Sequence, residues 1–157
     1  MFAIAVTDLE WFNNVRRSSV KNGVNFWTPT PWGLRQLQPG DRVYFMLKSP
    51  IRRIGGFGLF RSYKDMTLGD AWALYGVKNG MPSEERFAQK INDIAIGRAE
   101  KFKRSANPRI GCIELNDIEC LEDSSFFVPD SVGHKFPSQI VKIKYFAETD
   151  RLSARCK

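Results

Sequence analysis

Aromatic residues stand near predicted strand ends and in irregular segments, where they could stack on an unpaired nucleobase. They are Trp11-Phe12, Phe26-Trp27 and Trp32. A base that leaves its duplex needs a ring to stack on, and the phosphates beside it need cations. Any single aromatic residue is more often part of a core. Trp27 is the exception that we expect to form a pocket wall, because it stands between extended residues and prolines.

Basic residues extend this prediction to the nucleic-acid backbone. The chain has 24 Lys and Arg against 17 Asp and Glu, a formal charge of +7, and a basic domain attracts polyanions at long range. Residues 98–109 hold five basic residues and one acid, a pattern that suits either a solvated loop or a phosphate contact. The residues expected to contact the backbone are Arg16, Arg17, Lys21, Arg52, Arg53, Arg98, Lys101, Lys103 and Arg104.

Residue types that carry most enzyme chemistry are scarce. His134 is the only histidine and lies among Gly, Pro and Ser, so we expect a surface loop residue and exclude multi-histidine metal centres. Cys112, Cys120 and Cys156 form no Cys-x-x-Cys pair, which argues against a zinc site or a disulfide framework. Cys112 and Cys120 are expected to be buried small hydrophobes. Since no nucleophile or phosphate-loop motif is present, we expect no catalytic residue, no metal and no cofactor.

Composition and length predict one soluble domain. The chain has 157 residues, 43% hydrophobic and 26% charged, which is ordinary for a single globular domain. Residues 1–8 are apolar but short and lack a basic start, so they do not form a signal peptide. No apolar run approaches the ~20 residues that span a membrane. With an odd number of cysteines, a reducing compartment fits, and we expect a cytoplasmic protein without a membrane partner.

The candidate residues must be positioned by several strands and helices. Residues 2–6 are apolar throughout and predict a buried strand, and Thr7-x-x-Glu10 has the capping-box pattern that predicts a helix over 8–18. Residues 25–31 are expected to be irregular, because two prolines force an extended path. Glycines at 55, 56 and 58 within a predicted strand indicate bulges or a close backbone approach.

The remaining pattern completes the predicted fold. We expect strands over 42–48, 54–63, 110–120, 126–128 and 140–145, helices over 68–75 and 84–96, and a helical turn over 34–37. Long connections that hold helices separate the five or six strands. This order predicts an α+β fold in which a mixed, partly closed β-barrel carries helices packed outside.

Ten short segments spread over nearly the whole chain form an ordered set. They are AVTD with WF (5–12), VNFW (24–27), LQPGD (37–41), FxLKSP (45–50), IGGxGxF (54–60), AW (71–72), GxxNG (76–80), IGCI (110–113), FP (136–137) and IV (140–141). Together they resemble the EVE-like N-terminal domain of bacterial HNH endonucleases. That domain belongs to the PUA-like group with the EVE, ASCH, YTH and SRA domains, whose small barrel has a pocket for one base.

The resemblance implies a base pocket in this chain. In such a pocket Asn25 and Asp8 would hydrogen-bond the base edge, and Trp11 and Trp27 would stack on the base. Residues from three segments would surround it: Thr7, Asp8 and Trp11 at the end of the first strand, Asn25, Phe26 and Trp27 on one side, and Lys48, Ser49 and Pro50 on the other.

The resemblance also implies a function. We expect a reader that flips and recognises a modified base in double-stranded DNA, such as methylated or hydroxymethylated cytosine or 6-methyladenine, and that targets a restriction nuclease. The sequence holds no HNH motif, so we expect a domain excised from a longer nuclease or one that stands alone, with an HNH domain or a second copy as partner. Two alternatives stay open: an RNA-binding module of the PUA type, and an ASCH-like hydrolase of small substrates that uses Lys48 or Asp8.

Overall fold

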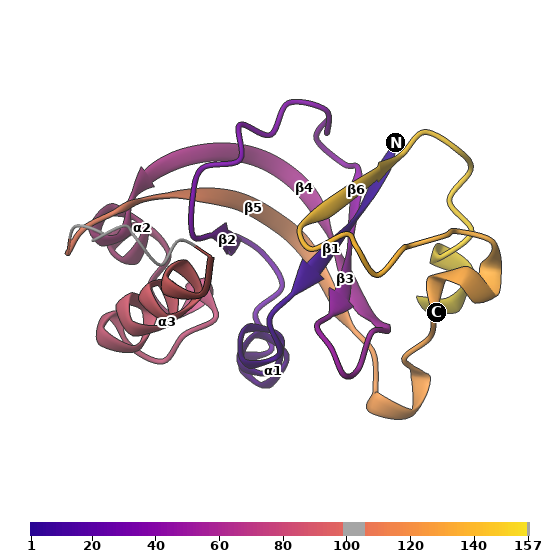
Figure 1. Ribbon diagram of the computed structural model, residues 1–157, viewed down its shortest axis with the longest axis horizontal. Coiled ribbons are helices and arrows are strands. Elements are labelled where there is room, and N and C mark those ends of the chain that lie inside the picture. The colour runs from indigo at the N-terminus through magenta and orange to yellow at the C-terminus, as the bar shows by residue number, and fades with distance from the viewer. Residues whose placement is uncertain (99–105, 157) are drawn as a thin grey trace.

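A single mixed sheet with helices outside it makes up the computed structural model, which describes residues 1–98 and 106–156, with the side chains of the last helix described as far as Ile94. The predicted α+β fold is confirmed (Figure 1). The elements are β1 (Phe2–Thr7), α1 (Leu9–Ser18), β2 (Val24–Thr28), β3 (Arg42–Leu47), β4 (Ile54–Thr67), α2 (Leu68–Tyr75), α3 (Glu84–Arg98), β5 (Arg109–Cys120) and β6 (Ile143–Phe146), with short 3-10 helices at Gly76–Asn79, Asp123–Ser125, Pro129–Val132 and Ser153–Cys156.

The sheet is curved enough to form a partly closed barrel. Its strand order is β2-β5-β4-β3-β1-β6, in which β1 and β3 run parallel and the other neighbours run antiparallel. The two long strands β4 and β5 arch over the molecule (Figure 1). As a result Phe26 of edge strand β2 stacks on Phe45 of β3, with ring centroids 6.0 Å apart, although two strands separate them in the sheet.

Glycines in β4 allow the close approach that the sequence predicted. A Cβ on Gly56 would lie 2.2 Å from the backbone oxygen of Glu119 on β5, and a Cβ on Gly58 would lie 2.7 Å from the side chain of Ile118. The β4–β5 register shifts between Phe57 and Leu59, and the β3–β4 register also shifts near this point. Bulges of this kind bend a strand and increase its twist, which helps a sheet to curl toward a barrel.

Strand β1 is apolar from residue 2 to residue 6, as suits a strand with both faces covered. Ala3 and Ala5 point into the barrel core with Phe45, whereas Phe2 and Ile4 belong to a second apolar cluster on the outer face. Successive side chains of a strand alternate between faces, so each set meets a different covering layer. Segments from the C-terminal third of the chain supply the outer layer, through the buried side chains of Phe127, Phe136, Phe146 and Leu152.

His134 is part of that outer layer, so its prediction as a surface loop residue is wrong. Its side chain is completely buried, and its ring lies edge-on to Phe2 and Phe146 at centroid distances of 5.0 and 5.5 Å. Its Nε2 accepts a hydrogen bond from the backbone N–H of Arg151 at 3.0 Å, and its Nδ1 lies 3.3 Å from a carboxylate oxygen of Glu148. The polar composition around His134 did not reveal that this segment folds back over the sheet.

Replacing His134 by alanine should therefore destabilise the protein by about 3 kcal/mol, because it opens a cavity beside two phenylalanines and leaves a backbone N–H without its acceptor. Denaturant unfolding of the variant measures this loss. The exposed neighbour Lys135 offers the control, since Lys135→Ala should change stability by no more than about 0.5 kcal/mol. Equal midpoints for the two variants would contradict the buried role of His134.

Several local predictions need correction. Residues 24–28 are not irregular but form β2, which pairs antiparallel with β5. Asp8 rather than Thr7 caps α1, since its carboxylate accepts from the N–H of Trp11, while the Thr7 hydroxyl donates to the carbonyl of Ala5. Residues 34–37 form no helical turn, residues 126–128 contribute one isolated bridge, and β6 starts at residue 143.

The other helix boundaries follow the sequence signals. Thr67 caps α2 by accepting from the N–H of Asp70, and Gly76 ends that helix, as predicted. No helix in residues 1–98 or 106–156 has the length and apolar character needed to cross a membrane.

Candidate functional site

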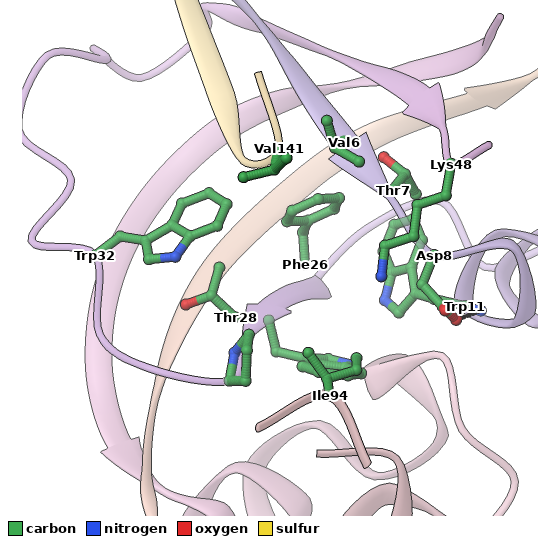
Figure 2. A pocket seen from close by; sticks show the side chains of 12 residues that line it. Val6, Thr7, Asp8, Trp11, Phe26, Thr28, Trp32, Lys48, Ile94 and Val141 are labelled. Atoms are coloured by element: carbon green, nitrogen blue, oxygen red, sulfur yellow. Dashed lines mark hydrogen bonds between the residues drawn. The ribbon is translucent and has the colours of Figure 1, made fainter. Parts of the chain in front are cut away.

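A pocket lies where the carboxyl ends of β1 and β3 meet edge strand β2 (Figure 2). Because β1 and β3 are parallel neighbours, their ends reach the same edge, and the N–H of Lys48 donates to the carbonyl of Thr7 at 3.1 Å. Only a small part of the pocket is enclosed, and the rest is open to solvent. Its lining residues are Val6, Thr7, Asp8, Trp11, Phe26, Trp27, Thr28, Pro29, Trp32, Lys48, Ile94 and Val141.

The structure brings six of the nine predicted pocket residues together here: Thr7, Asp8, Trp11, Phe26, Trp27 and Lys48. It does not bring the other three. Asn25 is fully buried away from the pocket, where its amide nitrogen donates to the side-chain oxygen of Asn79 at 2.8 Å and to the sulfur of Cys112 at 3.3 Å. Ser49 and Pro50 are exposed in the turn that follows β3. Asn25 therefore supports the pocket from behind rather than reading a base edge.

Sequence reasoning missed the lining residues that come from distant segments. Ile94 lies on α3 and Val141 precedes β6, and neither carries a local signal for a site. Trp32 carried one signal, because it was among the aromatic residues singled out for stacking. Only the folded chain shows that it enters the pocket beside Phe26 (Figure 2). The other missed lining residues are Val6, Thr28 and Pro29.

Two of the tryptophans that line the pocket are fixed by their own hydrogen bonds. The indole N–H of Trp11 donates to the carbonyl of Asn25 at 3.0 Å, and that of Trp27 donates to the carbonyl of Asn79 at 2.9 Å. Trp27 also lies edge-on to Phe87 of α3, with centroids 5.4 Å apart. Both rings are thus already ordered in the free protein, which lowers the entropic cost of binding a ligand.

An ion-pair network holds α3 against α1 at the pocket edge. The Asp8 carboxylate lies 2.9 Å from the Lys90 ammonium, and Glu10 pairs with both Lys90 and Arg86. Burial acts to lower the pKa of Lys90, but its hydrogen bonds to Asp8 and Glu10 outweigh burial and raise that pKa above the ordinary value. Lys90 therefore stays charged at neutral pH. Asp8 is committed to this pair and to the cap of α1, which leaves it poorly placed to act as a general base.

The cysteines are chemically quiet. Burial raises the pKa of the Cys112 thiol to about 11, and burial raises those of Cys120 and Cys156 to about 11 as well. A thiol with such a pKa is protonated at neutral pH and is a weak nucleophile. The prediction that Cys112 is buried is confirmed, while Cys120 is only partly buried. Within the described ranges, no three His, Cys, Asp or Glu side chains gather to hold a metal ion.

The predicted backbone-contacting residues whose side chains the structure describes do not form one surface around the pocket. Arg16 pairs with Asp123 at 2.6 Å, and Lys21 lies 3.6 Å from Glu119, both at the C-terminal end of α1. The helix rises about 1.5 Å per residue, so Arg16 is roughly 8 Å along the axis from Trp11 and roughly 12 Å from Asp8. Lys21 lies beyond the end of α1. Arg17 and Arg53 are exposed, and Arg52 packs over the ring of Phe136. The Arg98 side chain and Lys101, Lys103 and Arg104 lie outside the described part.

The protein is an α+β fold built on a mixed, partly closed barrel. Solved structures of an ASCH protein from Zymomonas mobilis share it. The unmutated protein matches with a TM-score of 0.56 and 12% identity over 97% of this chain and 92% of that one. A serine-to-alanine variant gives 0.59 and 13% over 93% and 88%, and a tyrosine-to-phenylalanine variant gives 0.58 and 10% over 93% and 90%. No protein-family model and no curated protein matches the sequence.

At these identities the likeness concerns the fold alone. ASCH domains belong to the PUA-like group, so the predicted barrel is confirmed at that level. The finer resemblance to EVE-like domains and the association with an HNH nuclease stay predictions.

Proposed function

We propose that this protein is a nucleic-acid-binding module that takes one unstacked base into the pocket beside β2. The observation that carries the proposal is a set of aromatic side chains, Trp11, Phe26, Trp27 and Trp32, around one pocket at the open edge of a PUA-like barrel. Stacking a base on an aromatic ring contributes about 1–3 kcal/mol. Removing that base from a duplex costs a few kcal/mol, so contacts with one or two rings offset the cost.

Cations at the pocket support the same proposal. Lys48 lines the pocket, and the Lys142 ammonium lies 6.0 Å from the ring centroid of Trp32. The backbone of Lys142 also contacts a lining residue, because its carbonyl accepts a hydrogen bond from the N–H of Val6 at 2.7 Å. The phosphates that flank a flipped base would meet these two charges, and the net charge of +7 draws the polyanion in.

The proposed ligand is double-stranded DNA with a modified base, and the proposed partner is an HNH restriction nuclease, in cis or as a separate chain. Val6, Ile94 and Val141 give the pocket an apolar part that suits a methyl group. Burying one methyl group contributes about 1 kcal/mol, so the preference for a methylated base should be moderate. A strong preference would need an unmodified base to leave a polar group unpaired.

Binding to matched duplexes at a stated salt concentration tests this function. The duplexes carry cytosine, 5-methylcytosine, 5-hydroxymethylcytosine or 6-methyladenine, with an RNA duplex alongside. A clear preference for one modified DNA would establish the reader and identify its base. Tighter binding to RNA would make the protein an RNA module, since the 2′-hydroxyl is what separates the two polymers at one site. Absence of binding to all of them would refute a nucleic-acid function.

Removing the pocket cations should weaken binding to every nucleic acid. The double variant Lys48→Gln/Lys142→Gln is expected to reduce the slope of log affinity against log salt by about 2, because each lost phosphate contact removes roughly 0.9. The matched variant Arg17→Gln/Lys21→Gln removes the same charge from the far end of α1. If both variants change the slope equally, binding depends on total charge and the pocket edge has no special role.

A second candidate function is hydrolysis of a small substrate, which the presence of both Asp8 and Lys48 in the pocket favours. Its weakness is that the Asp8 carboxylate already accepts from the N–H of Trp11 and pairs with Lys90. Turnover of substrate by the purified protein that disappears in Lys48→Gln, with the fold intact, would favour the hydrolase over the binding module.

A further inference from the structure

Trp32 differs from the other tryptophans of the pocket in its indole N–H. The N–H groups of Trp11 and Trp27 each have a carbonyl acceptor, whereas the Nε1 of Trp32 is buried and meets no acceptor among the described residues. Buried polar atoms without a partner are rare in native structures, and a buried indole N–H usually has one. Asn25 Oδ1 and His134 Nδ1 are also buried without a hydrogen-bond partner in the described part of the chain, but of the three residues Trp32 alone lines the pocket, where a bound ligand could supply the missing acceptor.

The position of Trp32 is fixed by contacts from the sheet. The hydroxyl of Tyr63 on β4 accepts from the backbone N–H of Trp32 at 2.9 Å and from that of Gly33 at 3.2 Å. Gly111 on β5 makes room for this arrangement, because a Cβ there would lie 2.4 Å from the Thr28 hydroxyl and 3.1 Å from the Tyr63 hydroxyl. The backbone of Trp32 is thus held in place by bonds that leave the indole N–H unused.

The polar groups of the pocket lie at opposite ends. Figure 2 shows the ring of Trp32 entering from one side, Lys48 and Asp8 on the other side, and Phe26 between them. A flat ligand in this pocket presents one edge to Trp32 and another to the side of Lys48 and Asp8, while its faces contact apolar side chains.

We infer that the Trp32 indole N–H donates a hydrogen bond to the bound ligand, so the pocket selects a planar heterocycle whose edge toward Trp32 carries a carbonyl oxygen or an unprotonated ring nitrogen. This inference rests on the proposed function and adds the residue that reads the base. Stacking alone discriminates poorly, since every base has a π-face. A fixed donor does discriminate, because a ligand without the acceptor leaves the N–H buried and unpaired.

NMR of the four indole N–H groups tests the inference. The protein is titrated with a duplex carrying one unpaired base, using adenine, cytosine, guanine and thymine in turn. The Trp32 resonance is expected to move downfield and to gain protection from exchange with water, because its N–H acquires an acceptor. Trp72, which is not among the lining residues, serves as the internal control, while Trp11 and Trp27 already have carbonyl acceptors and should gain no new hydrogen bond.

The variant Trp32→Phe keeps an aromatic ring and removes the donor. It should bind the unpaired thymine about tenfold more weakly, while the other three indole resonances keep their positions and so report an intact fold. Replacing the thymine by difluorotoluene, which has its shape without strong acceptors, should weaken binding to the wild-type protein and make no further difference to Trp32→Phe.

Three results would overturn the inference: a Trp32 resonance that stays in place while the duplex binds, equal affinity of Trp32→Phe and wild type, or equal weakening of the thymine and difluorotoluene duplexes by the variant. In each of these cases nucleic acid still binds, so the proposed function survives. If no duplex moves any indole resonance and none binds, the proposed function fails and the inference fails with it.

Discussion

Replacing Trp27 by alanine is expected to lower the free energy of unfolding by about 3–5 kcal/mol and to remove one wall of the pocket. The side chain is only 8% exposed, its N–H donates to the carbonyl of Asn79, and its ring meets Phe87 edge-on. Truncation would leave a cavity between β2 and α3 and a buried carbonyl without its donor. The sequence alone predicts that this variant loses its preference for modified ligand and keeps its fold. The packing of Trp27 in the structure predicts instead that ligand preference and folding stability are lost together.

The variant Trp27→Phe separates the two roles. It keeps a ring against Phe87 and gives up the hydrogen bond to Asn79, so it should cost roughly 1–2 kcal/mol and retain a wall for the ligand. Denaturant unfolding of both variants, followed by duplex binding under native conditions, gives the comparison. Unchanged stability of Trp27→Ala would mean that the ring contributes nothing to the contact between β2 and α3.

Gly56→Ala should destabilise the protein by about 3 kcal/mol or more. The added Cβ would lie 2.2 Å from the backbone oxygen of Glu119, and Gly56 pairs directly with Cys120 in the ladder between the two long strands. A backbone atom inside a sheet cannot move aside without breaking its neighbours' hydrogen bonds, so overpacking here lies at the upper end of its usual cost.

The adjacent glycine gives a matched control. A Cβ on Gly55 would meet side-chain carbons of Phe12 and Leu47 at 3.0 and 3.1 Å. Side chains adjust by a few tenths of an ångström, so Gly55→Ala should cost only about 1 kcal/mol. Thermal unfolding separates the two variants, because 1 kcal/mol corresponds to about 2–4 °C at this chain length. Equal shifts in melting temperature would show that the β4–β5 ladder can yield at Gly56.

Features that are encoded locally could be predicted from the sequence. The apolar run in β1, the Thr67 cap and the Gly76 stop of α2 each depend on a few neighbouring residues. Strand β2 could not be predicted in this way, because its pairing with β5 joins residues more than 80 positions apart and overrides the proline signal at 29 and 31. The N-cap at Asp8 shows the same limit on a smaller scale, since Thr7 and Asp8 are both good caps and the strand end decides between them.

The residues of the candidate site also fall into those that the sequence could place and those that only tertiary packing brings in. Thr7 ends β1, Asp8 follows it and Lys48 follows β3. Because β1 and β3 are parallel neighbours, these residues meet at one edge of the sheet, where the sequence resemblance had also placed them. Ile94 and Val141 join them only through the packing of α3 and of the segment before β6. Asn25 was misplaced because an amide suits both a base edge and a buried polar cluster, and residue type does not distinguish the two.

The ion pair between Lys90 and Asp8 has a consequence for the timing of binding. Ile94, which lines the pocket, is one turn beyond Lys90 on α3, and both partners of the pair are less than one-fifth exposed. At 0.1 M salt, interactions between exposed charges more than about 10 Å apart are largely screened, whereas partly buried ion pairs are screened much less. Under the proposed function, raising the ionic strength should therefore slow the association of nucleic acid with the exposed cations while the pocket keeps its shape. Association and dissociation of a ligand then respond to salt separately, the first strongly and the second weakly.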